Sequence, residues 1–217
     1  MCAGCHGMSG EGRPQAGYPR IAAQPEAYLV RQLEAYADGR RSSVVMEPLA
    51  RSLTAEERGR LAAHFASTDP KANPSPKTYS KRGETLALSG DNALRVQACQ
   101  NCHGPLGRGQ PPHGASLAGL APDYLRAEMH AWRSGRRRSD PSGQMPMIAG
   151  LLGNEDTEAV VLYYAGLPVP SPLRAEPPAR YAAKQPPTLE GVGQGPGKAG
   201  AAQGPAGSEA AQPGGNR

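Results

Sequence analysis

The cysteine residues constrain this chain more than any other feature. All four cysteines in the 217 residues fall in two pentads, Cys2-Ala3-Gly4-Cys5-His6 and Cys99-Gln100-Asn101-Cys102-His103. The pattern C-x-x-C-H is the attachment signal for c-type haem. Two thiols at this spacing can form thioethers with the vinyl groups at one edge of a porphyrin, and the next imidazole can reach the iron. We therefore predict two covalently bound haem c groups, attached at Cys2, Cys5, Cys99 and Cys102, with His6 and His103 as iron ligands.

Other uses of the cysteines explain the pattern less well. A zinc ribbon has its two C-x-x-C knuckles about 15–20 residues apart, whereas these pairs are 97 residues apart. A thioredoxin-like redox motif would lie in a βαβ pattern, and no strand pattern is evident. Neither zinc nor a structural disulfide gives a reason for the histidine that follows each pair.

The chain contains an internal repeat. The pattern Cys-His-Gly-x-x-Gly-x-Gly begins at Cys5 and again at Cys102. Further blocks match at an offset of 96 to 99 residues: Tyr28-Leu29 with Tyr124-Leu125, Gly39-Arg40-Arg41 with Gly135-Arg136-Arg137, and Met46-x-x-Leu49-Ala50 with Met145-x-x-Ile148-Ala149. The sequence is therefore a tandem duplication of one haem-binding unit.

Each unit has helical patterns. One Trp, one Phe and eight Tyr are too few aromatic side chains for an all-β fold, which needs aromatic and β-branched residues. Apolar residues recur at helical spacing, and Thr54 with Glu57 forms a capping box, whereas Asn154 with Thr157 is a weaker cap. We predict an all-α fold with helices over residues 26–38, 54–66, 122–134 and 154–165.

The sixth iron ligand should recur once in each unit. Met46 and Met145 meet this condition, and a methionine opposite histidine raises the haem potential into the electron-carrier range. Met147 lies beside Met145 and is the alternative in the second unit, although the alignment with Leu49 and Ala50 favours Met145. A buried gap-filling methionine is the other interpretation of these positions.

These motifs resemble those of class I cytochromes c, and the duplication resembles dihaem cytochromes of the c4 type over residues 2–167. The resemblance implies a few short helices around each haem, with ligands His6 and Met46 in the first unit and His103 and Met145 in the second. It also implies that a backbone carbonyl holds each imidazole. Pro19 fits this role in the first unit. In the second unit Ala115, Ser116, Pro111 and Pro112 leave the choice open.

The resemblance sets the expected domain organisation. The first domain would cover residues 1–66, a linker 67–80, the second domain 81–167, and a disordered Pro/Gly/Ala-rich tail 168–217. The family has a helix before each C-x-x-C-H, and the resemblance implies such a helix over about residues 81–98 in the second unit. The first motif, however, begins at Cys2, and no signal peptide precedes it. Haem attachment in this family occurs outside the cytoplasm. We therefore expect a periplasmic protein whose sequence here is truncated at its N-terminus.

The predicted function is electron transfer in a periplasmic respiratory chain. No catalytic acid, base or nucleophile is implied, and the expected partners are a terminal oxidase, a cytochrome bc complex or a dehydrogenase. A cytochrome subunit of a dehydrogenase complex is the alternative, and a dihaem peroxidase is a more distant one. A net charge of +5 spread along the chain does not indicate nucleic acid as a partner, and no apolar run is long enough for a transmembrane helix. We also expect one arginine each from Arg40-Arg41 and Arg136-Arg137-Arg138 to bind a haem propionate.

Overall fold

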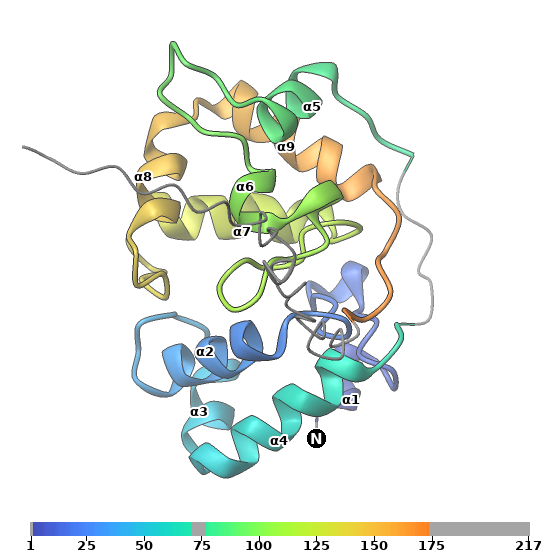
Figure 1. Cartoon of the computed structure of the whole chain (residues 1–217). Helices are drawn as coiled ribbons and strands as arrows, with labels where there is room; N and C mark the ends of the chain where they lie inside the picture. Colours follow the sequence, from blue (N-terminus) through green and yellow to red (C-terminus); the bar gives the residue numbers. More distant parts are fainter. Residues whose placement is uncertain (1, 71–76, 174–217) are drawn as a thin grey trace, which may run out of the picture. The chain divides into compact units, whose positions relative to one another are not determined.

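The computed structural model describes residues 2–70 and 77–173 (Figure 1). These two ranges are called the first half and the second half. The prediction of an all-α fold is confirmed, because within these ranges no β-strand forms and pairing of the β type is limited to isolated bridges. Most of the predicted tail and the middle of the predicted linker lie outside the described residues.

The first half contains the helices α1 Ala3–His6, α2 Glu26–Ala37, α3 Met46–Arg51 and α4 Ala55–Ser67, with a 3-10 turn at Pro14–Ala16. The capping box predicted at the start of α4 is present, since Thr54 Oγ1 accepts from the Glu57 amide and the Glu57 carboxylate accepts from the Thr54 amide. Helix α2 packs against both α3 and α4. Its N-terminus follows Pro25, a residue that fits a helix start because its fixed φ suits the entry.

The second half contains α5 Lys81–Leu88, α6 Gln100–His103, α7 Pro122–Arg133, α8 Gln144–Leu151 and α9 Asn154–Gly166, with a 3-10 turn at Pro105–Gly107. The helix predicted over residues 81–98 is too long, because α5 ends at Leu88. Gly90 there has φ +75°, and the Asp91 carboxylate accepts from the Ala93 and Leu94 amides. This local turn competes with the helix and returns the chain toward the second cysteine motif. The N-cap residue of helix α9 is Gly153, and not Asn154 as the sequence analysis predicted.

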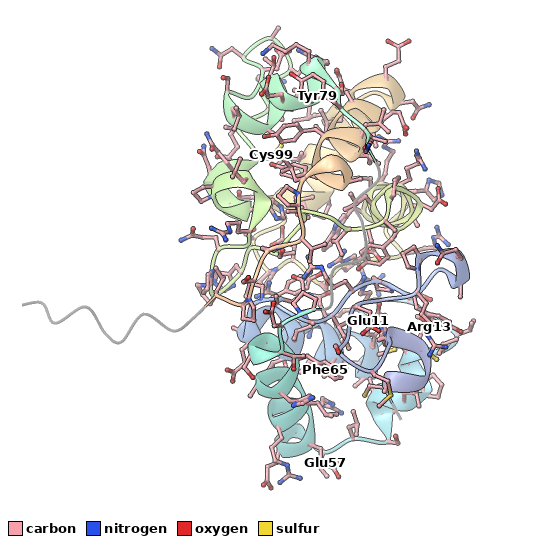
Figure 2. All side chains as sticks on the ribbon, turned by 90° about the vertical axis from the view of Figure 1, so that its right-hand side faces the viewer. Glu11, Arg13, Glu57, Phe65, Tyr79 and Cys99 are labelled. Carbon is pink, nitrogen blue, oxygen red and sulfur yellow. The ribbon has the colours of Figure 1, made fainter. Side chains whose placement is uncertain are left out.

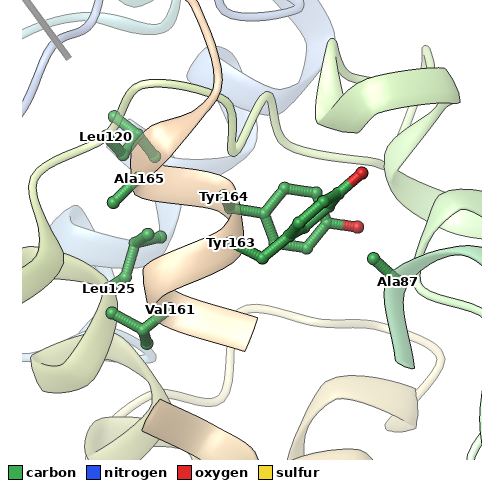
Figure 3. Close-up of a cluster of buried hydrophobic side chains, with 7 residues drawn as sticks. All are labelled: Ala87, Leu120, Leu125, Val161, Tyr163, Tyr164 and Ala165. Atoms are coloured by element: carbon green, nitrogen blue, oxygen red, sulfur yellow. The ribbon is translucent and has the colours of Figure 1, made fainter. Parts of the chain in front are cut away.

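Helices α5 and α9 lie side by side and form the core of the second half (Figure 1). They approach closely because Gly83 has no side chain: a Cβ there would overlap the Ala159 carbonyl group. Tyr163, Tyr164 and Val161 from α9 pack with Ala87, Leu120 and Leu125 in one apolar cluster (Figure 3). The buried core residues of the first half are mainly alanines, with Tyr28 and Phe65.

The two halves are joined by hydrogen bonds between matching loops. Arg41 and Arg137 form an antiparallel bridge, flanked by Ser42 N to Arg136 O at 3.1 Å and Arg138 N to Arg40 O at 2.6 Å. These loops follow α2 and α7, the helices that match in the repeat. The described residues belong to one compact unit, so the halves share an interface.

Candidate haem sites

The first cysteine motif forms one turn of helix. The His6 amide donates to the Cys2 carbonyl oxygen at 2.9 Å and the Cys5 amide to the same oxygen at 3.2 Å. Residues three positions apart in a helix lie on the same face, so the Cys2 and Cys5 thiols, both free and half-buried, are presented together. His6 follows directly and is buried.

A backbone carbonyl holds the His6 ring. The Nδ1 atom donates to the Pro19 carbonyl oxygen at 2.8 Å, as the resemblance implied. Because a carbonyl oxygen can only accept, Nδ1 carries the proton and Nε2 keeps its lone pair for a metal. Burial lowers the pKa of His6, and the bond to Pro19 opposes part of that shift. The ring is therefore held in the neutral form that a metal ligand requires.

The second motif repeats this arrangement. The His103 amide donates to the Cys99 carbonyl oxygen at 3.0 Å, and His103 Nδ1 donates to the Ala115 carbonyl oxygen at 2.9 Å. The support that the sequence left open is therefore Ala115, not Ser116 or either of the prolines. Burial lowers the pKa of His103 as well. Figure 2 shows Cys99 in the upper part of the view.

A cavity of about 420 Å³ opens beside the second motif. Cys99, Cys102, His103 and Met145 all line it. Apolar side chains of the lining come from α7, α8, α9 and the adjoining loops: Leu117, Leu120, Leu125, Ile148, Leu152, Val160 and Val161. Two thiols, an imidazole and a thioether that converge on one apolar cavity fit a covalently attached haem.

The two methionines occupy equivalent places. Met46 begins α3 and its amide donates to Ser43 Oγ at 3.1 Å. Met145 lies in the first turn of α8 and its amide donates to Asp140 Oδ2 at 2.8 Å. Met147 is 54% exposed and does not line the cavity. Position therefore favours Met145 over Met147 as the residue that faces a haem.

A buried polar cluster lies at the interface of the halves. Arg41 Nη2 donates to Tyr124 Oη at 2.9 Å, and Arg137 Nη2 donates to Tyr28 Oη at 3.0 Å. Each arginine therefore crosses to the tyrosine of the other half. We call this set the junction cluster: Tyr28, Gln32, Arg41, Tyr124, Glu128 and Arg137. Sequence analysis missed its polar members on α2 and α7, although the offset of 96 residues that aligns the tyrosines also aligns Gln32 with Glu128.

The structure identifies which arginines of the two predicted clusters are buried. Arg41 and Arg137 are 5% and 6% exposed. Arg40 instead forms an exposed ion pair with Asp38, and Arg136 and Arg138 are exposed. Arg137 and Glu128 also line the cavity of the second half. A cationic side chain in the lining of an apolar cavity suits a ligand that has carboxylate groups, such as haem.

The arrangement does not resemble a zinc centre. In the described part of the chain no group of three or more cysteine, histidine or acidic side chains is placed to hold a metal ion. No disulfide joins any of the four cysteines, and each pair is followed by a histidine whose ring is held by a carbonyl. Together with the all-helical duplicated fold, these sites define a c-type cytochrome built from tandem class I units.

Comparison with known proteins agrees with this class. No protein-family model matches the chain. The chain is 38% identical to the thiosulfate dehydrogenase electron acceptor of Thiomonas intermedia, over 77% of this chain and 79% of that protein. It is 32% identical to cytochrome c4 of Pseudomonas aeruginosa, over 77% of this chain and 84% of that protein.

A solved structure extends the likeness to the fold. The thiosulfate dehydrogenase TsdBA of Marichromatium purpuratum matches with a TM-score of 0.71 and 35% identity, over 86% of this chain. This chain spans 40% of that longer chain. The chain belongs to the cytochrome c4 family. The prediction of a haem-containing electron carrier is therefore confirmed. None of the helices in residues 2–70 and 77–173 has the length and apolar character needed to span a bilayer.

Proposed function

We propose that this cytochrome carries two haem c groups, each with histidine and methionine as axial ligands. Cys2, Cys5, His6 and Met46 would hold the first, and Cys99, Cys102, His103 and Met145 the second. Residues 1–66 and 81–167 would be the two haem-binding domains, joined by residues 67–80. The observation that carries the proposal is the repeated imidazole support, in which Nδ1 donates to Pro19 O and to Ala115 O in the two halves.

The residues of the chain have distinct roles in this proposal. The carbonyl groups fix the plane and tautomer of each imidazole and raise its basicity as a ligand. The methionine thioether would be the second protein ligand of each iron and would leave no iron position for a substrate, which argues against the peroxidase alternative. Bound haem supplies a ferric/ferrous couple whose potential depends on its ligands, its burial and its hydrogen bonds. At the second motif, the apolar walls of the cavity would keep water away from that couple.

The partner follows from the relatives. Two are named electron acceptors of thiosulfate dehydrogenase, and one of the matching solved structures is a thiosulfate dehydrogenase. We propose that this protein accepts electrons from a dehydrogenase that oxidises thiosulfate and passes them on to a terminal oxidase or another carrier. Because c-type haem is attached outside the cytoplasm, the compartment we propose is the periplasm.

Paired cysteine replacements test the two haem sites. Cys2→Ala with Cys5→Ala should leave a protein with one haem, and so should Cys99→Ala with Cys102→Ala. Haem per chain is measured from the reduced pyridine haemochrome spectrum of protein secreted to the periplasm. Two haems retained in either paired variant would contradict the assignment of the sites.

Mixing the purified proteins tests the partner. The oxidised cytochrome should become reduced when thiosulfate and a thiosulfate dehydrogenase are both present, as followed by its visible absorption bands. Thiosulfate alone is the control and should leave the haem oxidised. Failure of reduction with active dehydrogenase would remove this partner and leave the electron carrier without an assigned donor.

A further inference from the structure

The junction cluster departs from the symmetry of the repeat at one position. Tyr28 matches Tyr124, and Arg41 matches Arg137, each at an offset of 96 residues. The same offset aligns Gln32 with Glu128, so an amide in the first half corresponds to a carboxylate in the second. A symmetric repeat would have an acidic side chain at both of these positions or at neither. The cluster instead contains one, Glu128.

Both arginines depend on that carboxylate. Glu128 Oε1 lies 2.5 Å from Arg41 Nη2, and Glu128 Oε2 lies 2.6 Å from Arg137 Nη1. The Glu128 side chain is 19% exposed and the two arginine side chains 6% and 7%. Burial alone would raise the pKa of Glu128, but the two guanidinium groups outweigh it and lower the pKa. Glu128 is thus ionised at neutral pH, and two buried positive charges share one negative charge.

Gln32 already faces the same arginines. Its Oε1 atom accepts from Arg41 Nη1 at 3.0 Å and from Arg137 Nη2 at 3.0 Å. A glutamate at position 32 would therefore have two buried partners without any change in the backbone. The chain offers two equivalent places for the carboxylate and uses one of them.

The cluster is close enough to the second haem site to act on it electrostatically. Gln32, Glu128 and Arg137 line the same cavity as His103 and Met145. A charge acts strongly at short range where water is excluded. A buried negative charge stabilises the more positive ferric state of a haem and so lowers its reduction potential. A guanidinium released from its carboxylate stabilises the ferrous state and raises it.

We propose that Glu128 is the residue whose charge tunes the reduction potentials of the haems across the junction of the two halves. It acts directly through its own negative charge and indirectly by neutralising Arg41 and Arg137. The inference rests on the proposal that each half carries a haem. Glu128 would be a tuning residue rather than a ligand, since its two carboxylate oxygens bond to Arg41 and Arg137.

Three variants of the holoprotein separate charge from structure. Glu128→Gln removes the carboxylate, and Gln32→Glu adds a second one. The double variant Gln32→Glu/Glu128→Gln moves the single carboxylate to the matched position in the first half. Haem per chain is counted first, and the two reduction potentials are then measured by spectroelectrochemical titration. The mean of the two potentials should be highest in Glu128→Gln and lowest in Gln32→Glu. The double variant should return to the wild-type mean.

The results are distinguishable. A haem count other than two in the wild type would defeat the proposed function, whatever the potentials. Two haems with potentials unchanged in both single variants would overturn the role of Glu128 alone. A double variant whose mean follows one of the single variants would overturn it as well, because the charge is conserved there. If Glu128→Gln does not fold, Gln32→Glu decides: a lower mean supports the proposal, and an unchanged mean overturns it.

Discussion

Gly83 lies where α5 meets α9, and replacing it with alanine should destabilise the protein. Its missing side chain admits the Ala159 carbonyl group and Tyr163. An added methyl group would overlap a helix carbonyl, which cannot rotate away as a flexible side chain can. The two helices would have to separate along their contact.

Two opposing effects determine the magnitude. Alanine in place of glycine favours a helix by up to about 1 kcal/mol. Overpacking a tight contact costs about 1–3 kcal/mol, and the contact with backbone places Gly83→Ala at the upper end. The net loss should be about 1–2 kcal/mol, or roughly 2–8 °C in midpoint for a unit of this size. Haem attachment at the second motif should also fall, because the Leu86 carbonyl of α5 accepts from the Cys99 amide at 3.4 Å.

Thermal unfolding of the holoprotein, followed by far-ultraviolet circular dichroism, measures the effect. Gly59→Ala is the matched control, since Gly59 lies within α4 and nothing contacts the position of its absent Cβ. That control should be stabilised by up to about 1 kcal/mol. Equal stabilisation in Gly83→Ala would refute the reasoning about the contact of α5 with α9.

Further predictions concern the ligands and the buried polar groups. Met46→Ala and Met145→Ala should each remove about half of the methionine–iron charge-transfer absorption, whereas exposed Met147→Ala should leave it intact; loss in the last variant would reassign the ligand. Tyr164→Phe should leave the free energy of unfolding unchanged or raise it by up to about 1 kcal/mol, because the buried Tyr164 hydroxyl lies near the Cys99 thiol without a hydrogen bond of good geometry among the described residues; a large loss of stability would contradict this. Since its two arginines lower the pKa of Glu128, that carboxylate stabilises the fold above the ordinary carboxyl range and loses this effect as pH falls through its lowered pKa. Acid titrations of stability should therefore be shallower in Glu128→Gln, and identical curves would contradict the ion pairs.

The long helices could be predicted because apolar spacing and helix capping are features of neighbouring residues in the sequence. The apolar spacing of residues 26–38 and 54–66 corresponds to α2 and α4 within a residue or two, and the capping box fixed the start of α4. Helix α5 was predicted ten residues too long because the family pattern implies a helix up to the second cysteine motif, while the turn at Gly90 and Asp91 stops the helix at Leu88. Local patterns do not reveal which of two competing hydrogen-bonding arrangements is more stable.

Of the two carbonyl groups that hold the histidine rings, one could be predicted from the sequence and the other could not. Pro19 could be identified through the family pattern, but the second half has no proline at the matching place. There the Ala115 carbonyl takes the role, and any residue can supply a carbonyl. The cross-half bonds of Arg41 and Arg137 depend on tertiary packing, so the sequence could indicate only that arginines recur at matched positions.

The haem content of the secreted protein tests the central claim most directly. Intact mass spectrometry of the full-length chain, secreted by a host that matures c-type cytochromes, should find the mass of the polypeptide plus two haem groups. Peptide mapping should find one haem on the Cys2–Cys5 peptide and one on the Cys99–Cys102 peptide. A colourless protein of unmodified mass, with its four thiols free or bound to zinc, would contradict the account.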